Sequence, residues 1–299
     1  MSKSIYSISK PANAIITAIM GFIGFACVFP YLLSVSISFT SETSLKTQGF
    51  SVIPKDFTTA TYDFLFLNWQ KLLQAYGNTI IVTLLGTLIV LCVTLTLGYV
   101  LSRKSFKWRN SLSVFIFITM LFNAGMTANY MIMTQVLHLN DTIWALILPL
   151  TINPFWIFIA RTYFMTSIPE SIIESATIDG ASELTIFRKM ILPLSLPVGA
   201  TIGLFSTLTY WNDWFNAKLY IENSNLDTLQ YFLVRSEESA QYLTRNAATL
   251  GAYAVEIVSQ IPDQTLMMAT MVIATLPLAL AYPFFQRYFV SGLTVGAVK

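Results

Sequence analysis

Six long apolar runs constrain this chain more than any other feature of its sequence. Each is close to the ~20 residues that an α-helix needs to cross a bilayer. Only 11% of the 299 residues are charged, whereas a soluble domain carries about 25%. We therefore expect an all-α polytopic membrane protein, because backbone at membrane depth must be helical or covered by protein. One transmembrane domain is expected over residues 1–299, with spans at about 13–39, 78–101, 111–137, 142–164, 198–221 and 265–289.

The positions of lysine and arginine orient these spans. If the N-terminus is inside, eleven of the 17 basic residues fall in cytoplasmic segments. The bias is strongest in the run Arg103–Arg109, directly at a helix end, where it counts most. Both termini are therefore predicted to be cytoplasmic, and the first run, too long for a signal peptide, is expected to be retained. The net charge of +2 is too small to indicate a nucleic-acid partner.

Two predicted outer segments, about 40–77 and 222–264, are long and mix polar with aromatic residues. Loops of this length usually have a function or carry structure of their own. Two interpretations stay open: short amphipathic elements that cap the bundle, or a docking surface for an extracellular partner.

The predicted cytoplasmic segment 166–197 has the pattern of a helical hairpin. Ser167 and Glu170 have the spacing of a capping box at the start of its first helix. Gly180 can take the left-handed conformation that ends a helix, and Ser182 can cap the second one.

Two prolines, Pro193 and Pro197, are expected to break this second helix before the chain enters the membrane again. The hairpin also holds more apolar residues than an exposed loop needs, so we expect part of it to meet a partner. These residues are Ile172, Ile173, Ile178, Leu184, Ile186, Phe187 and Met190.

Residues 174–181, Glu-Ser-Ala-Thr-Ile-Asp-Gly-Ala, resemble the EAA motif of bacterial ABC importer permeases. In that family the loop is the coupling helix, which fits a groove of the cytoplasmic ATPase subunit and transmits its closure. Ser175 stands where the motif has its first alanine, and helix packing tolerates this change because both residues are small. The resemblance implies a coupling role for Glu174, Ser175, Ala176, Asp179, Gly180 and Ala181.

The resemblance covers nearly the whole chain. The segments 144–149, 210–216 and 282–299 are similar to carbohydrate-uptake permeases of the binding-protein-dependent type, in particular the second maltose permease and LplC-like proteins. It departs at Trp156, where an asparagine is usual, and at Lys218, where an apolar residue is usual. The sugar, its length and its linkage therefore cannot be carried over from relatives.

This resemblance implies a multi-pass protein of the bacterial plasma membrane with several partners. They are a second permease subunit, two ATP-binding subunits, an extracellular solute-binding lipoprotein and a carbohydrate substrate. The sequence has no G-x-x-x-x-G-K-[ST] phosphate loop and no metal-ligand cluster. ATP and magnesium are therefore expected on the partner ATPase subunits, and no cofactor or enzymatic activity is expected in this chain.

The fifth apolar run holds the best candidates for a substrate pathway. Trp211 lies about 14 residues from Pro197, or roughly 21 Å along a helix, which places it in the outer half of the bilayer. Aromatic faces stack on sugars, and amide or carboxylate groups bond hydroxyls. Asparagines of the third run either line the same path or allow close helix packing. The candidates are Trp211, Asn212, Asp213, Phe215, Asn123 and Trp156.

Three alternative functions stay open at this stage. An ion-gradient-driven secondary transporter would usually show paired ionisable groups in broken spans, and here Asp213 is the one good intramembrane candidate. A membrane-embedded enzyme would need a catalytic constellation, which this sequence lacks. An importer of a non-sugar solute is opposed mainly by the resemblance.

Overall fold

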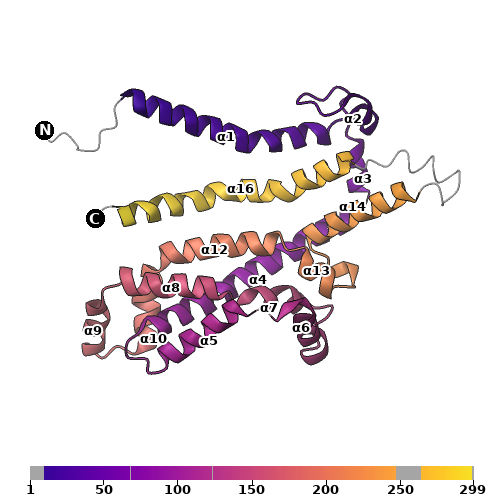
Figure 1. Cartoon of the computed structure of the whole chain (residues 1–299). Coiled ribbons are helices and arrows are strands. Elements are labelled where there is room, and N and C mark those ends of the chain that lie inside the picture. The colour runs from indigo at the N-terminus through magenta and orange to yellow at the C-terminus, as the bar shows by residue number, and fades with distance from the viewer. Residues whose placement is uncertain (1–9, 68, 123, 247–263, 298–299) are drawn as a thin grey trace. The chain divides into compact units, whose positions relative to one another are not determined.

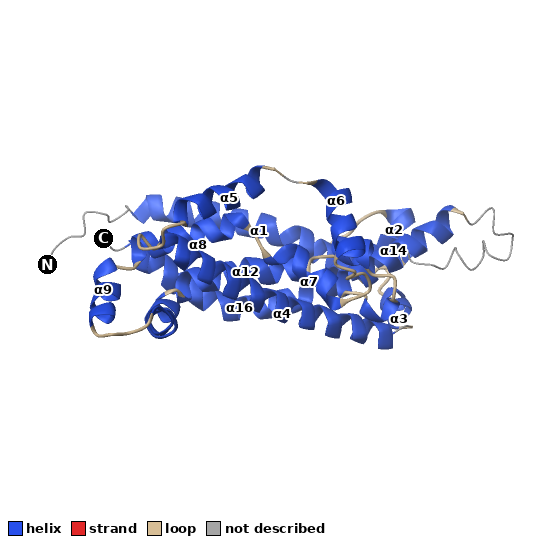
Figure 2. Cartoon of the chain, turned by 90° about the horizontal axis from the view of Figure 1, so that it is seen from below, coloured by secondary structure: helices blue, strands red, loops and turns tan. Residues whose placement is uncertain are grey.

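The computed structural model describes residues 10–67, 69–122, 124–246 and 264–297, and the side chains as far as Leu280 (Figure 1). Within these ranges the named elements are all helical, as Figure 2 shows, apart from an isolated antiparallel bridge between Thr40 and Phe57. The all-α class predicted from the sequence is therefore confirmed.

Three of the predicted spans begin in long helices, α1 (Lys10–Ser38), α4 (Trp69–Ser102) and α16 (Gln264–Ala297). By length and composition α1 and α4 can each cross a membrane. Within the described side chains, α16 offers a shorter apolar segment, Gln264–Leu280.

The third and fourth predicted spans, 111–137 and 142–164, are not single helices, which corrects the expectation. The third is divided into α5 (Arg109–Leu121), α6 (Gly125–Met131) and the π-helix η1 (Ile132–Val136), and Asn123 lies outside the described residues. The fourth is divided into α7 (Ile143–Thr151) and α8 (Pro154–Ser167), with a bend of 51° between them.

The bend between α7 and α8 has a local cause. Asn153, which precedes Pro154, is extended, since a proline disfavours the helical conformation of the residue before it. The Asn153 side chain then accepts a hydrogen bond from the Phe155 N–H at 3.0 Å and caps α8. If each bent helix pair counts as one span, up to five spans occur among the described residues, so the predicted six spans and cytoplasmic termini stay predictions.

The fifth predicted span, 198–221, is also broken. Helix α12 (Leu196–Trp211) ends at the fourteenth residue of this span, and α13 (Phe215–Tyr220) follows. The Asp213 carboxylate accepts a hydrogen bond from the Asn216 N–H at 3.2 Å and from the Asn216 side chain at 2.9 Å. An aspartate in this position offers the backbone an alternative to continuing the helix, which a hydrophobicity pattern does not reveal.

Both predicted outer segments carry short helices. The first contains α2 (Glu42–Gln48) and α3 (Ala60–Phe66), and the second contains η3 (Ser224–Leu226) and α14 (Leu229–Arg245). The described parts of these segments thus carry secondary structure of their own, whereas a role in capping the bundle and a role in docking both stay predictions.

The chain forms two compact units. One holds the described residues up to Trp69 and from Arg235 to Leu276, and the other holds those from Gln70 to Val234 and from Pro277 onward. A single permease domain over 1–299 stays a prediction. In the first unit, the Glu42 carboxylate caps α16 by accepting hydrogen bonds from the Thr265 N–H at 3.0 Å and the Gln264 N–H at 3.3 Å.

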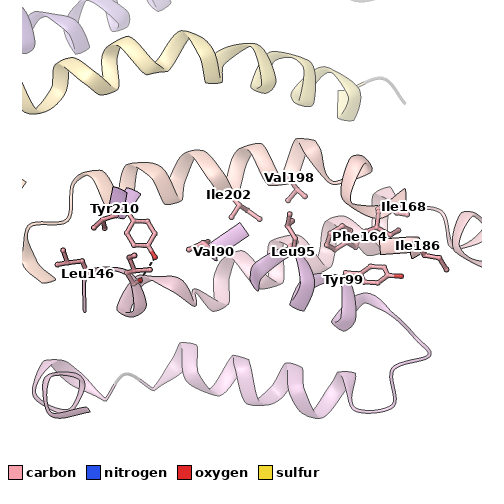
Figure 3. Close-up of a cluster of buried hydrophobic side chains, with 14 of the residues drawn as sticks. Val90, Leu95, Tyr99, Leu146, Phe164, Ile168, Ile186, Val198, Ile202 and Tyr210 are labelled. Carbon is pink, nitrogen blue, oxygen red and sulfur yellow. Dashed lines mark hydrogen bonds between the residues drawn. The ribbon is translucent and has the colours of Figure 1, made fainter. Parts of the chain in front are cut away.

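The core of the second unit lies where α4, α8 and α12 meet (Figure 3). Gly98 lets α4 approach α8 closely, because a Cβ there would stand 2.7 Å from the Ala160 Cβ and 3.1 Å from the Arg161 backbone nitrogen. Gly86 makes room for the Tyr210 ring, which is 2% exposed and donates its hydroxyl to the Ile147 carbonyl at 2.9 Å. Small residues at helix contacts are typical of bundles in lipid, where close van der Waals packing drives association.

Candidate functional site

The hairpin between α8 and α12 begins with α9 (Glu170–Ile178), which ends in a Schellman motif. The Ala181 N–H bonds the Ala176 carbonyl and the Gly180 N–H bonds the Thr177 carbonyl, each at 3.0 Å. Gly180 has a φ of 79°, a conformation that other residues rarely adopt. The predicted left-handed helix end at Gly180 is confirmed.

The predicted capping box at Ser167 is wrong. Ser167 is the last residue of α8, and α9 begins after Pro169 without a side-chain cap. The Glu170 carboxylate instead accepts a hydrogen bond from the Lys104 ammonium at 2.8 Å. That hydrogen bond and the charge of Lys104 hold the pKa of the Glu170 carboxyl below its usual value.

The second arm of the hairpin starts at Ser182, as predicted, because its hydroxyl accepts a hydrogen bond from the Thr185 N–H at 3.3 Å. Its helical elements, α10 (Glu183–Ile186), η2 (Phe187–Ile191) and α11 (Leu192–Leu194), follow without interruption.

The predicted break of this arm before α12 is present, but it falls after Pro193, which itself lies inside α11. The π-helical turn η2 precedes it, and its wider hydrogen bond, from the Leu192 N–H to the Phe187 carbonyl, fits a helix that must pass a residue without an N–H. The arm bends by 75° only at Ser195. Pro197 lies in the first turn of α12, where no N–H is needed.

The hairpin has one buried face and one exposed face. Ile173, Ala176 and Ile186 are buried in the core that Figure 3 shows in part. Ile178 and Leu184 point away from it and are 85% and 65% exposed. The other predicted coupling residues divide in the same way: Ala181 packs partly against the core, and Glu174, Ser175, Asp179 and Gly180 are exposed. The exposed face thus combines apolar, small and acidic residues at one turn.

Tyr99, near the end of α4, joins the hairpin to this helix. Its hydroxyl donates to the Glu183 carboxylate at 3.1 Å, and its ring lies 5.3 Å from the Phe187 ring and 6.0 Å from the Phe164 ring. With the Lys104–Glu170 ion pair, the two arms of the hairpin have polar links to α4 and to the turn that follows it. Sequence reasoning did not find these links, because no local pattern pairs residues that lie 66 and 84 positions apart.

The predicted pathway residues do not converge on one cavity. Trp211, 7% exposed at the end of α12, borders an apolar groove of about 680 Å³ together with hydroxyl-bearing residues of α4 and α12, namely Thr83, Thr87 and Thr207. Asn212 is exposed and accepts a hydrogen bond from the Gln230 side chain at 3.3 Å. Trp156, on α8, stacks on Phe205 of α12 with ring centroids 5.2 Å apart.

Phe215 lies in a different place, a second cavity of about 350 Å³ between α6, η1 and α13. Asn129 and Asn216 line it as well, and the rings of Tyr130 and Tyr220 stack beside it at 6.0 Å. Asp213 affects this cavity indirectly, because its carboxylate accepts a hydrogen bond from the Asn216 side chain. The last candidate, Asn123, falls outside the described residues.

The segment that follows α13 is fixed by groups that sequence reasoning did not single out. The Asp141 carboxylate accepts hydrogen bonds from the backbone N–H groups of Glu222 and Asn223 at 2.7 and 2.8 Å. The Asn78 side chain donates to the Asn225 carbonyl at 2.8 Å, and the Thr79 hydroxyl accepts from the Leu229 N–H at 2.7 Å. The sequence gives one indication of the role of Asp141, because aspartate is among the residues that tolerate a positive φ in a turn, and the φ of Asp141 is 53°.

Within the described residues, no three His, Cys, Asp or Glu side chains come together as metal ligands would. The expectation of no bound cofactor stays a prediction. The described residues thus present cavities and hydrogen-bonded links between the hairpin and the end of α4.

Comparison with known proteins gives consistent results. The model of the family described as binding-protein-dependent transport system inner membrane component matches residues 94–295. Protein LplC of Bacillus subtilis is 38% identical over 94% of this chain and 92% of its own length. The polygalacturonan/rhamnogalacturonan transport system permease protein YtcP of the same organism is 35% identical over 91% and 93%.

A solved structure shares the fold as well. It is a chain from the crystal structure of a bacterial ABC transporter involved in the import of the acidic polysaccharide alginate. The two chains have a TM-score of 0.75 and 28% sequence identity, and the match covers 96% of this chain and all of that one.

Proposed function

The chain belongs to the family of binding-protein-dependent transport system inner membrane components, and we propose that it forms half of the translocation pathway of an ATP-driven carbohydrate importer. An oligosaccharide is the substrate class that fits best, because the relatives include permeases named for polygalacturonan/rhamnogalacturonan and for arabinooligosaccharides. Its proposed partners are a second permease subunit, two ATP-binding subunits and an extracellular solute-binding lipoprotein. ATP is hydrolysed on the partner subunits, since this sequence has no phosphate loop.

The exposed turn of the hairpin is the observation that carries the proposal. Ile178 and Leu184 are large apolar side chains that stand in water unless a partner covers them. They flank the left-handed turn at Gly180, which fixes the angle between the two arms. A groove on an ATP-binding subunit would cover these side chains and bind the Glu174 and Asp179 carboxylates beside them.

Movement of the hairpin then has a route into the membrane. Tyr99 and Lys104, at the end of α4, hold Glu183 and Glu170 on the two arms. When closure of the ATP-binding subunits displaces the hairpin, these links pass the displacement to α4, and close packing at Gly98 passes it to α8. The paired permease subunits thereby alternate between outward and inward access.

Two surfaces are proposed to meet the sugar. In the groove beside α12, Trp211 offers an aromatic face and Thr207 a hydroxyl. In the cavity beside α13, Phe215 offers an aromatic face and Asn129 and Asn216 offer amides. Trp156 stacks on Phe205 and borders neither of these cavities.

The first experiment is an affinity pull-down of this chain from gently solubilised native membranes, with the co-purifying proteins identified by mass spectrometry. Recovery of an ATP-binding subunit and a second permease is the expected result. Recovery of the chain alone, folded and active in uptake driven by an ion gradient, would show that it is a secondary transporter.

The pathway is tested separately by uptake in the assembled complex. Trp211→Ala is expected to lower sugar uptake about twofold to tenfold while the ATP-binding subunits still co-purify, because it removes a stacking face worth about 0.5–1.5 kcal/mol. Trp144→Ala is the matched control, since this tryptophan is exposed on α7 and borders neither cavity. Equal uptake by the two variants would remove Trp211 from the pathway.

A further inference from the structure

A small polar cavity lies where the hairpin meets the end of α4, apart from both proposed sugar surfaces. Its volume is about 120 Å³, and its polar lining consists of Tyr99, Ser102, Arg103, Lys104 and Glu170. Apolar residues of α8 and η2 close the other side. Because one water needs about 10–15 Å³ of such space, the cavity has room for roughly eight to twelve waters, which is enough for one phosphate group.

The cavity contains an unfulfilled donor. The Nε of Arg103 is buried and has no hydrogen-bond partner among the described residues. The guanidinium carbon lies 5.9 Å from the centroid of the Tyr99 ring, a cation–π contact that orients the group. A buried donor without an acceptor is costly, which makes it a good indicator of a missing ligand with acceptor oxygens.

The surrounding charge selects an anion. Arg103, Lys104, Lys107 and Arg109 occur within seven residues, and Glu170 is the one acidic residue that lines the cavity. Glu170 is paired with Lys104 and therefore neutralises at most one of these cations.

We propose that this cavity binds the phosphate of an anionic phospholipid headgroup, with Arg103 and Lys104 as its main contacts. Basic pockets between helices at the cytoplasmic surface of a membrane suit such headgroups. Trp108, 66% exposed on the same loop, is an interfacial type of side chain that would lie beside the acyl chains. The inference goes beyond the proposed transport role and depends only on the membrane location of the chain.

The lipid would also affect the hairpin. Its phosphate competes with the Glu170 carboxylate for Lys104, one of the two polar links between the hairpin and α4. Anionic lipid would thus loosen the first arm while leaving the Tyr99–Glu183 link in place. The composition of the membrane would in this way set how firmly the hairpin is held.

The test uses the full chain, purified with its co-purifying partners, and native mass spectrometry during titration with phosphatidylglycerol or phosphatidylcholine of equal chain length. Arg103→Lys keeps the charge but removes the guanidinium fork, and Arg109→Lys makes the same change outside the cavity. We expect Arg103→Lys to weaken phosphatidylglycerol binding roughly fivefold or more, and Arg109→Lys to change it by less than about twofold. Equal weakening by the two substitutions, or no preference for phosphatidylglycerol over phosphatidylcholine, would show that the basic residues attract anionic lipid without a defined site. Either result would overturn the proposal.

Two further arms use the wild-type chain. Inorganic phosphate at about 10 mM should leave the lipid bound; displacement would identify free phosphate as the ligand and refute the lipid assignment. Phosphatidylglycerol with a photoreactive headgroup should label the peptide that spans residues 99–109. Labelling confined to other segments would overturn the proposal without relying on the folding of any variant.

Discussion

Substitution of Gly180 separates backbone strain from side-chain contact at the hairpin turn. Gly180 has a φ of 79°, and a Cβ built there meets no atom within 4 Å inside this chain. A side chain at this position therefore causes no clash within the protein, and its cost comes from the left-handed backbone alone.

The size of this cost depends on the residue. Alanine in the left-handed region costs roughly 1–2 kcal/mol, which shifts the equilibrium between the closed and the opened turn by about 5–30-fold. Asparagine tolerates this region better because its short polar side chain can bond locally, and a β-branched valine tolerates it worst. We expect the coupling of ATP hydrolysis to sugar uptake to decrease in the order glycine, asparagine, alanine, valine at position 180.

The assay is sugar uptake per ATP hydrolysed in proteoliposomes that contain the assembled importer. Amide hydrogen exchange of residues 170–181 gives an independent readout of the turn, in which the Ala181 N–H should lose protection in the same order. Better coupling in Gly180→Ala than in Gly180→Asn would show that the size of the side chain in a partner's groove determines coupling, rather than the strain of the left-handed backbone. Normal coupling and protection in Gly180→Val would refute the reasoning altogether.

Three further predictions concern packing, the hairpin link and pH. Gly98→Ala should destabilise the chain by about 1–3 kcal/mol through overpacking, visible as a lower unfolding temperature in detergent. Gly199→Ala should not lower this temperature, because its Cβ would stand 3.7 Å from a leucine methyl. Equal unfolding temperatures for the two variants would contradict the close approach of α4 to α8 at Gly98. Tyr99→Phe should cost about 1 kcal/mol or less and raise amide exchange in the second hairpin arm, and unchanged exchange would remove this link. Burial opposes ionisation of Glu42, but hydrogen bonds from the start of α16 outweigh burial and lower the pKa of this carboxyl. The ionised Glu42 therefore stabilises the fold fully above the pKa of the unfolded state, and this stabilisation is lost as the pH falls through the pKa of the folded state. Glu42→Gln should therefore flatten the decline in unfolding temperature between about pH 5 and pH 3, and parallel declines would show that this carboxylate is not involved.

Short-range features of the fold were predictable from the sequence. The helix end at Gly180 and the cap at Ser182 were expected and are present, because such signals act over three or four residues. The same holds for the helical class, since long apolar runs in lipid have few alternatives. The candidate coupling residues also lie together, because they are consecutive in one turn.

Local reasoning failed where a distant group competes for the same side chain. The Ser167–Glu170 capping box is absent because Ser167 belongs to the end of α8, and Lys104 donates to the Glu170 carboxylate instead. The fifth apolar run is a broken helix because Asp213 bonds the Asn216 N–H, although its hydrophobicity predicts a continuous one.

The sequence by itself determined that the chain is helical, membrane-embedded and equipped with a hairpin turn, since each of these depends on neighbours in the chain. Only the tertiary structure decided which helix holds that hairpin and which cavities the pathway residues border. Trp211 and Phe215 are four residues apart, yet the break between α12 and α13 sends them to different cavities. The links from Tyr99 and Lys104 join residues 84 and 66 positions apart, and such pairs form only when packing brings their helices together.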